Sequence, residues 1–583
     1  VLDVTAETRY WISTGLSPEG ISASVPSAYY SSAFAWGMTP GNDNRADALR
    51  LTGASGSVDA SLIFATAEAG EPRSTVGMES LWWNWNAPTT GWRRFWVDGH
   101  PLHAIVSIYP GQGAGVQPSQ VVGSSERSYL SNGMVEVVLY AQAGEQNDIR
   151  LSRRPGVDIQ RSVTLRWSAS EAPAYLSYKT AVTDASMMQN SLVSGLHSPQ
   201  NVAVSDDGQY LFNSATRQLH AFLRDPESGE IALAHIAASE SNQDTFVRSD
   251  LKDHQLWWNP LHDRLFAFRP LSGHSFAVPD EGSLLNHQSV EIDASPTNHW
   301  RYAPTVGAPD GRHLYQINGT MRTLEVRQAD TPEQLTLVQI VSPHDIARDD
   351  QLVVPNLTEP VGVTLSPDGL HLYLVDRRDL FVFSRDTSSG MLEPSREILH
   401  GSDPDGPFYE MGNLRNAALD ANASILFVSG EQSRSGAVFD SAVAAFDISA
   451  DGSRPEHLDT LTGFFFELDR DAAAMASHLK LGWNSLRACE HLLPHADLVA
   501  VDVFCRSGYF VVRWNPETGA LEVTDFAVTG ADDRFGNKLP PFLGTESRQM
   551  ANSPDGKHAY RANDHSLYTA IYIFERAAAM APD

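Results

Sequence analysis

The chain has 583 residues, of which 42% are hydrophobic and 19% charged, and these proportions are typical of a folded globular protein. Its formal net charge of −29 argues against nucleic acid as a partner and against docking on anionic lipid, because both need lysine and arginine concentrated on one face. No run of about 18 apolar residues occurs, so we expect no membrane span. The length predicts more than one domain.

The first part of the chain predicts a β-sandwich after an unassigned start. Residues 1–40 hold aromatic, strand-like fragments broken by glycine and proline, and we leave this lead-in segment unassigned. Over residues 41–167 apolar and polar residues alternate between frequent turns, which predicts an antiparallel sandwich. Trp82, Trp83 and Trp85 would form either a carbohydrate-stacking platform or part of the core. Alternation along a strand favours core packing.

Several motifs of this region resemble those of a known family. The chain reads NDNRA from Asn42, then GEP, then SLWWNWNAP from Ser80, and a late strand ends in YPG. These motifs resemble the pre-peptidase C-terminal type domains of secreted bacterial proteins, over about residues 41–167. The resemblance implies an accessory domain in an exported protein. Where that family has an Asp-rich turn, this chain has GHPLH at Gly99–His103, so no metal role is carried over.

The second part of the chain, residues 168–583, is repetitive. Residues 195–236 predict four short strands separated by tight turns of glycine and aspartate. The same pattern returns six times, at residues 254–278, 304–341, 359–399, 415–461, 487–526 and 548–576. Units of four strands at this spacing predict a seven-bladed β-propeller. The last unit ends at its third strand, so we expect Ala174–Asp184 to pair with Ile571–Arg576 and close the ring.

The sequence motifs of the repeats also resemble those of a known family. SPDG stands between the first two strands of a unit, and RD-x-x-(S/T)-G precedes the outer strand. This resembles the lactonase-like bacterial seven-bladed propellers over about residues 174–576. The resemblance implies the fold and leaves the activity open, because a fold does not determine function. We interpret the repeated aspartates of the first turns as turn formers, at Asp207, Asp310, Asp368 and Asp555. Asp469–Leu481 departs from the repeat and has helical composition.

Candidate ligand contacts follow from the residues that begin each innermost strand, because these strands ring the mouth of the central channel. In the last, first and second units these positions hold the expected ligand contacts Arg548, Gln549, Gln200, Asn201 and Gln255. His254 and His197 are the catalytic candidates, and Arg415 and Asn416 would face them from the fifth unit. Guanidinium groups bind carboxylates bidentately, and histidine transfers protons near neutral pH. Such residues can equally hold only water.

Other catalytic and metal motifs are scarce. The sequence has no G-x-S-x-G, H-E-x-x-H, C-x-x-C or phosphate-binding loop. Asp403, Asp405 and Glu410 have a spacing of oxygen ligands suited to Ca²⁺, although aspartates beside proline and glycine commonly form turns. The sequence requires no other cofactor.

Three hypotheses about function stay open. In the first, an exported, extracytoplasmic protein binds an anionic small molecule or the acidic end of a glycan at the channel mouth. In the second, the same residues make an enzyme of the lactone hydrolase or acid-sugar lyase type, with a histidine base and arginines that hold the anion. In the third, the protein is a non-catalytic adhesin or interaction scaffold within a larger exported assembly.

The two cysteines give the first testable prediction. Cys489 and Cys505 flank the turn around Pro494, so we expect a disulfide between them rather than two buried thiols. Peptide mapping without reduction should recover the two cysteine peptides as one linked species. Alkylation of both thiols in the denatured, unreduced protein would contradict the pairing.

Overall fold

The computed structural model describes the residues 40–62, 65–66, 79–98, 104–111, 123–124, 129–130, 135–153, 163–170, 174–183, 187–188, 191–192, 196, 199–215, 218–238, 254–269, 272–278, 284–292, 304–344, 350–398, 411, 413–434, 438–461, 491–495, 499–505, 508–528, 539, 550–565 and 568–578. The chain forms two compact units, and the second begins at Ala172 and also takes in Arg127–Asn132. The described residues are strands and turns apart from one 3-10 helix, η2 (Arg45–Asp47), so the predicted all-β fold is confirmed.

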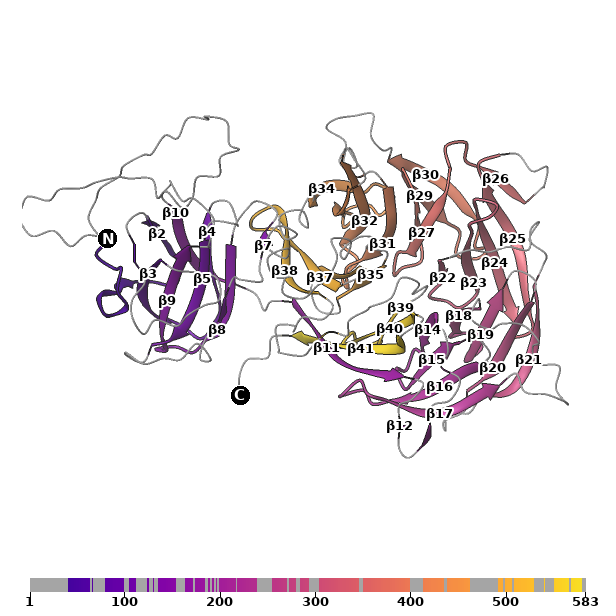
Figure 1. Cartoon of the computed structure of the whole chain (residues 1–583). Helices are drawn as coiled ribbons and strands as arrows, with labels where there is room; N and C mark the ends of the chain where they lie inside the picture. The colour runs from indigo at the N-terminus through magenta and orange to yellow at the C-terminus, as the bar shows by residue number, and fades with distance from the viewer. Residues whose placement is uncertain are drawn as a thin grey trace, which may run out of the picture. The chain divides into compact units, whose positions relative to one another are not determined.

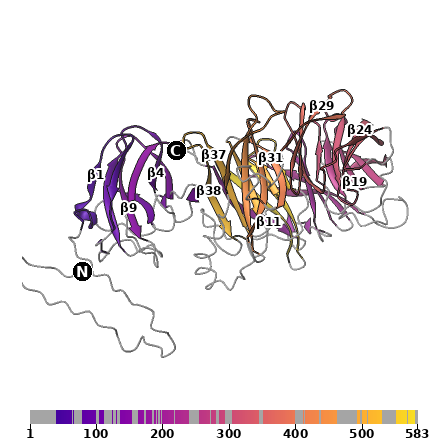
Figure 2. The same cartoon turned by 90° about the horizontal axis from the view of Figure 1, so that it is seen from above.

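The first unit is a sandwich of two sheets, as expected. One sheet has the strand order β1 (Leu49–Leu51), β3 (Ser80–Asn86), β9 (Gln146–Arg153), β5 (Ala104–Pro110) and β6 (Gly123–Ser124). The other has the order β2 (Gly56–Ala60), β10 (Val163–Ala169), β4 (Gly91–Asp98) and β8 (Val135–Ala141). Figure 2 shows the two sheets as separate layers, with β1 and β9 in one and β4 in the other.

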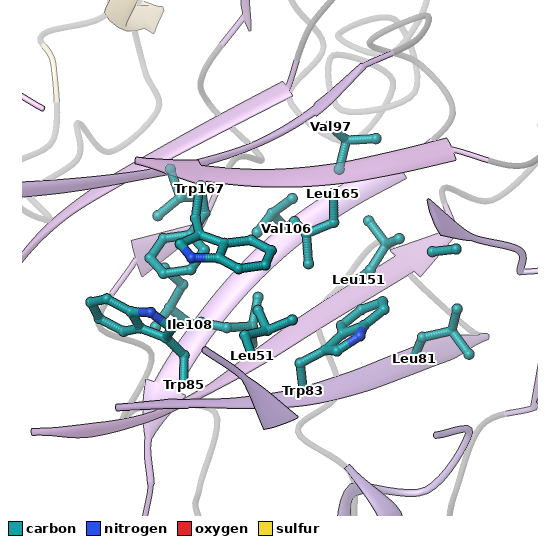
Figure 3. Packing of buried hydrophobic residues seen from close by; sticks show 14 of the residues in the cluster. Leu51, Leu81, Trp83, Trp85, Val97, Val106, Ile108, Leu151, Leu165 and Trp167 are labelled. Atoms are coloured by element: carbon teal, nitrogen blue, oxygen red, sulfur yellow. The ribbon is translucent and has the colours of Figure 1, made fainter. Parts of the chain in front are cut away.

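The tryptophans of β3 lie in the interior of this unit. Trp83 and Trp85 pack with Trp167 of the facing sheet and with aliphatic residues of both sheets (Figure 3). Trp82 points to the other face of its sheet and is also buried, against Tyr109. No indole of the three is accessible for stacking on a sugar, so the prediction of core packing is confirmed.

The NDNRA motif fastens the start of the sandwich to its sheet. The side chain of Asn42 donates to the carbonyl of Trp82 at 3.1 Å, and Asp43 accepts the backbone N–H of Thr66 at 2.5 Å. Arg45 lies over the ring of Trp82 and donates through Nε to Asp148 at 2.8 Å. Each buried charge of the motif therefore has a partner, as burial requires.

The second unit consists of four-stranded antiparallel sheets. Their strands are β14 (Asn201–Val204), β15 (Tyr210–Ser214), β16 (Gln218–Arg224) and β17 (Ile231–Ala238); β18 (Gln255–Asn259), β19 (Arg264–Arg269), β20 (Ser272–Ala277) and β21 (Leu285–Ile292); β22 (Thr305–Gly307), β23 (His313–Asn318), β24 (Thr323–Thr331) and β25 (Gln334–Ser342); β27 (Pro360–Leu365), β28 (His371–Asp376), β29 (Leu380–Arg385) and β30 (Leu392–Ile398); β31 (Asn413–Leu419), β32 (Ile425–Arg434), β33 (Val438–Asp447) and β34 (Glu456–Leu461); β35 (His491–Pro494), β36 (Ala500–Cys505), β37 (Gly508–Asn515) and β38 (Ala520–Val528).

Short additional strands extend some outer edges of these sheets. The outer strands β21 and β25 pair in parallel, and β26 (Gln351–Val353) also pairs with β25. The segment β7 (Tyr129–Leu130) pairs with β38, and β12 (Met187–Met188) forms a small hairpin with β13 (Ser191–Leu192). The sequence repeats did not predict these pairings, of which those of β26 and β7 cover sheet edges that would otherwise present unpaired backbone groups.

The sheets form a closed ring. The innermost strands contact one another in the order β14, β18, β22, β27, β31, β35 and β39 (Met550–Asn552), and β39 contacts β14 again. Figure 1 shows these strands around a common centre. The last sheet consists of β39, β40 (His558–His565), β41 (Tyr568–Ala578) and β11 (Ala174–Thr183), with Val182 opposite Ile571 and Tyr178 opposite Phe574. The expected closure of a β-propeller by a strand from before its first sheet is confirmed.

A group of polar residues, buried apart from Asp555, joins the first sheet of the ring to the last, and we call it the closing cluster: Arg224, Asp555, His558 and Tyr560. Arg224, at the end of β16, donates through Nε to the hydroxyl of Tyr560 at 2.7 Å. Its Nη2 lies 3.1 Å from a carboxylate oxygen of Asp555 and 2.9 Å from Nδ1 of His558. Its Nη1 donates to the carbonyl of Gly208, in the first turn of its own sheet. One guanidinium thus fixes two sheets relative to each other.

The same arrangement recurs between two sheets that follow one another in the chain. We call this second group the internal cluster: Asp310, His313, Tyr315 and Arg385. Arg385 donates through Nε to Tyr315, and its Nη2 lies 3.1 Å from Asp310 and 2.9 Å from Nδ1 of His313. The interpretation of Asp310 and Asp555 as turn formers is confirmed, since each accepts a backbone N–H of its own turn. The ion pair across sheets is an additional role.

Burial and neighbouring charges shift the pKa values in both clusters. Burial, followed by the charge of Arg224, lowers the pKa of His558 to about 4, and burial and Arg385 lower that of His313. Burial raises the pKa of Tyr560 and of Tyr315 to about 12. Both histidines are therefore neutral near pH 7, as an Nδ1 that accepts from an arginine requires.

A glycine substitution tests the packing of the closing cluster. Gly229 has a φ of +70°, and a Cβ added there would lie 2.1 Å from Cδ2 of His558. We expect Gly229→Ala to lower the free energy of unfolding by about 3 kcal/mol or more, because the backbone strain of about 1–2 kcal/mol is added to the displacement of a buried ring. Urea denaturation followed by tryptophan fluorescence measures this difference.

Gly519 supplies the matched control. It has a φ of +64° and nothing within 4 Å of an added Cβ, so Gly519→Ala introduces the backbone strain alone. We expect it to cost only about 1–2 kcal/mol. Equal losses for the two variants would contradict the tight packing of His558 on Gly229.

Candidate functional site

The candidate site is the mouth of the channel where the innermost strands begin. In each antiparallel sheet the start of the innermost strand lies beside the end of the second strand, as the pairs Asn201–Ser214 and Asn413–Glu431 show. The turn between the second and third strands therefore lies at the same end of the sheet. Residues at the starts of the innermost strands and residues in these turns can therefore contribute to one binding site on this face.

The structure brings the expected residues of β14 and β18 together, and all of them are buried. Gln200, Asn201, His254 and Gln255 each expose 5% of their surface or less. The side chain of Asn201 donates to the carbonyl of His254 at 2.7 Å, and the hydroxyl of Ser214 donates to the same carbonyl at 3.2 Å. The ring of His254 lies 5.9 Å from that of His274. Asn201 therefore joins two neighbouring sheets beneath the surface of the mouth.

Other predicted residues lie outside the described residues. These are His197, Arg548, Gln549, Asp403, Asp405, Glu410, Cys489 and the predicted helix at Asp469–Leu481. Their roles as ligand, catalytic, calcium and disulfide residues stay predictions. Cys505 is described; it ends β36 and is buried.

Two further properties concern only the described part of the chain. Within it, no three histidine, cysteine, aspartate or glutamate side chains are grouped so that they could hold a metal ion. Within the same residues, no helix combines the length and apolar character needed to cross a membrane.

Arg415 lies at an irregularity of β31. The register shifts between Leu414 and Asn416, so that Arg415 is the extra residue of a β-bulge. Bulges redirect side chains and are common beside binding sites. The side chain of Arg415 is 25% exposed, and its Nη2 donates to the carboxylate of Glu431 at 2.9 Å, whose side chain is only 7% exposed. The Nε of Arg415 is buried and has no hydrogen-bond partner among the described residues.

A second arginine lies at the same end of the neighbouring sheet. Arg377 forms an ion pair with Glu359 at 2.9 Å, and its Nε is also buried without a partner. The backbone N–H of Leu414 donates to the carbonyl of Arg377 at 2.8 Å, which connects this turn to β31. We call Glu359, Arg377, Arg415 and Glu431 the mouth cluster.

Asp376 holds the turn that carries Arg377. This carboxylate is buried and accepts the backbone N–H groups of Thr358, Glu359 and Arg377 at 2.5, 2.5 and 2.7 Å. It also accepts the hydroxyl of Thr358 at 2.8 Å. Four donors on one buried carboxylate fix the backbone on both sides of the mouth cluster.

The described strand β35 adds a histidine to this part of the mouth. β35 begins at His491. His491 is partly exposed, and β35 contacts β31, the strand of Arg415. The repeat pattern therefore does not indicate four residues of the mouth: His491, Arg377, Glu359 and Glu431. The RRD after a strand end and the HLLP before a valine-rich strand are the patterns that could have indicated two of them.

Asn416, the remaining predicted contact, has a local role. Its Oδ1 accepts the backbone N–H of Ala417 at 2.9 Å. A Cβ at Gly362 would lie 2.9 Å from the Cα of Asn416, so β27 and β31 approach closely here. This close approach brings the two arginines of the mouth cluster onto adjacent strand ends.

Comparison with solved structures gives weak similarities. A candidate 6-phosphogluconolactonase of Bacteroides fragilis is 14% identical with a TM-score of 0.41, covering 64% of this chain and 98% of that chain. Hydrazine synthase of Kuenenia stuttgartiensis is 16% identical with a TM-score of 0.41, covering 68% and 100%. A periplasmic gluconolactonase of Pseudomonas aeruginosa is 15% identical with a TM-score of 0.35, covering 56% and 87%. Neither the family models nor the curated proteins compared with the chain match it.

The buried position of Asn201 leads to a prediction about stability. We expect Asn201→Ala to lower the free energy of unfolding by about 1–3 kcal/mol, because the buried carbonyl of His254 loses a donor. Asn422→Ala is the control, since Asn422 is exposed in a turn and only its backbone N–H is bonded, to Asp420. Urea denaturation of both variants measures the difference. A loss at Asn201 no larger than at Asn422 would contradict a structural role.

Proposed function

We propose that this protein is an exported, seven-bladed propeller protein with an accessory sandwich domain, and that it binds an anionic small molecule or the acidic end of a glycan at the channel mouth. The described ring from β14 to β39 supports the blade count. The export proposal rests on the predicted disulfide and on the sequence resemblance of the sandwich. The ligand proposal rests on the mouth cluster.

The observation that carries the ligand proposal is the state of the Arg415 guanidinium. The side chain is 25% exposed, and one of its five N–H donors is bonded to Glu431. The exposed N–H donors can bind a ligand that brings an oxygen acceptor. A carboxylate fits best, because it can accept from two N–H groups of one guanidinium in parallel.

The glutamates of the mouth cluster narrow the class of ligand. Glu359 and Glu431 each balance one arginine, so a bare anion meets two carboxylates as well as two guanidinium groups. Hydroxyl groups of a ligand can donate to these carboxylates while its own carboxylate accepts from the arginines. A sugar acid such as a uronate or aldonate offers both kinds of group.

The second candidate function, hydrolysis of a lactone or cleavage of an acid sugar, is favoured by one observation. His491 is a partly exposed imidazole at the start of the strand beside the one that carries Arg415. It could act as a general base while Arg415 holds the developing carboxylate. His254, the base expected from the sequence, has no exposed surface through which a substrate could reach it.

Calorimetric titration with galacturonate and gluconate tests the ligand proposal. We expect Arg415→Met to weaken binding about tenfold or more, and Glu431→Gln to strengthen it, because the first removes the donors and the second removes a repelling charge. Arg454→Met is the control, since Arg454 is 78% exposed and forms an ion pair with the neighbouring Asp451.

Three outcomes separate the hypotheses. Binding that responds to Arg415 and Glu431 in opposite directions supports the proposed site. Turnover of an aldonolactone that falls in His491→Asn, with binding of the product retained, supports the enzyme. No binding of any acid sugar by the unmodified protein would overturn both and leave an interaction scaffold.

A further inference from the structure

The closing cluster and the internal cluster have the same contacts but different positions in the chain. The sheets joined by the internal cluster are consecutive, so the chain itself connects them. The strands β39, β40 and β41 come last among the described strands, and contacts alone hold them to β11 and to the sheet of β14. We call this boundary the closing seam. The closing cluster holds the last sheet to the first, and the pairing of β11 with β41 holds β11 within the last sheet.

The proton of His558 decides whether the closing cluster can form. An arginine is always a donor, so the contact between Nη2 of Arg224 and Nδ1 of His558 requires Nδ1 to be unprotonated. The single proton of the neutral ring is then on Nε2, which is buried and has no partner. A second proton at Nδ1 would remove this hydrogen bond and place two positive charges side by side.

Other charged groups around His558 do not offset this effect. Asp555 comes from the turn before β40, Glu575 from β41, Lys179 from β11 and Arg224 from β16. Asp555 is already bound to Arg224, and Glu575 forms an ion pair with Lys179 at 3.4 Å. Asp225, after β16, acts on Tyr560 and is satisfied by the backbone of its own turn. The two acids nearest the ring therefore already have cationic partners.

We propose that protonation of His558 in mild acid loosens the closing seam, so that closure of the propeller ring is a pH-sensitive device built into this chain. Neutral pH holds the first and last sheets together through Arg224. Acid weakens this connection, because protonation of His558 removes its hydrogen bond with Arg224. The site at the channel mouth depends on the ring, so opening would also release a ligand bound there.

The direction of the pH effect follows from the titration of His558. Its pKa of about 4 in the closed ring lies below the ordinary 6.5, so the opened seam binds more protons between these values. Stability of the seam is therefore complete above pH 6.5 and falls as the pH falls through this window. The lowered pKa of Asp555 acts in the same direction only below about pH 4.

Hydrogen exchange of the full-length protein, followed by mass spectrometry and corrected for intrinsic exchange rates, tests the proposal. Between pH 7 and pH 5 we expect the opening equilibrium of β16 and β40, which carry Arg224 and His558, to rise about tenfold or more. Peptides of β28 and β29, which lie within the continuous chain, should change less. Equal protection of the seam at both pH values would overturn the proposal.

Two matched variants show whether the acid sensitivity of the seam comes from His558 or from other groups. In His558→Asn the Oδ1 of asparagine takes the place of Nδ1 and stays neutral, so we expect the pH dependence of the seam to disappear. His313→Asn makes the same change in the internal cluster and should leave the pH dependence of the seam unchanged. A seam that responds to acid in His558→Asn as in the unmodified protein would contradict the proposal.

A measurement on the unmodified protein decides the question if His558→Asn fails to fold. Titration of the histidine ring resonances by NMR, with that of His313 assigned from His313→Asn, should then show a second ring that stays neutral well below pH 6.5 and broadens as the seam opens. Titration of every ring other than that of His313 near pH 6.5 would overturn the proposal.

Discussion

The ring depends on arginines that end the third strand of a sheet and bind the sheet before it. Arg224, Arg385 and Arg576 each donate through Nη1 to a glycine carbonyl in the first turn of their own sheet. Their other N–H groups reach acids of the neighbouring sheet, and Arg576 bonds to the buried Asp502 at 2.6 Å. Apolar packing between sheets is non-directional, whereas these bonds fix which residues face each other. The arginines thus set the register of the ring.

The candidate site uses the opposite ends of the sheets. The turns with the arginine clusters lie where first and second strands meet, and the mouth cluster lies where second strands end and first strands begin. This separation lets one face supply rigidity while the other presents partly exposed charges. Asp376 and the bulge at Arg415 hold those charges on strand ends rather than on long loops, which keeps their geometry fixed.

The fold was largely predictable from the sequence, because equivalent turns in the repeated sheets use the same residue types. Aspartate and glycine mark the turns of the sheets, and the missing outer strand of the last sheet identified β11 as its replacement. The site was predictable only in part, since burial depends on neighbours that no repeat specifies. Gln200 and His254 occupy the expected strand starts but lie beneath the surface. Glu431 lies towards the end of β32, and a bulge redirects Arg415. The repeat pattern indicates neither feature.

Covalent trapping of the ring closure tests the central claim most directly. Ser177 of β11 lies opposite Glu575 of β41, and opposite residues of antiparallel strands are close enough for a disulfide. The double variant Ser177→Cys and Glu575→Cys should form this cross-link in the folded protein under mild oxidation, detected as a linked peptide by mass spectrometry. Failure to form it in folded protein, with both new thiols free to react, would contradict a ring closed by β11.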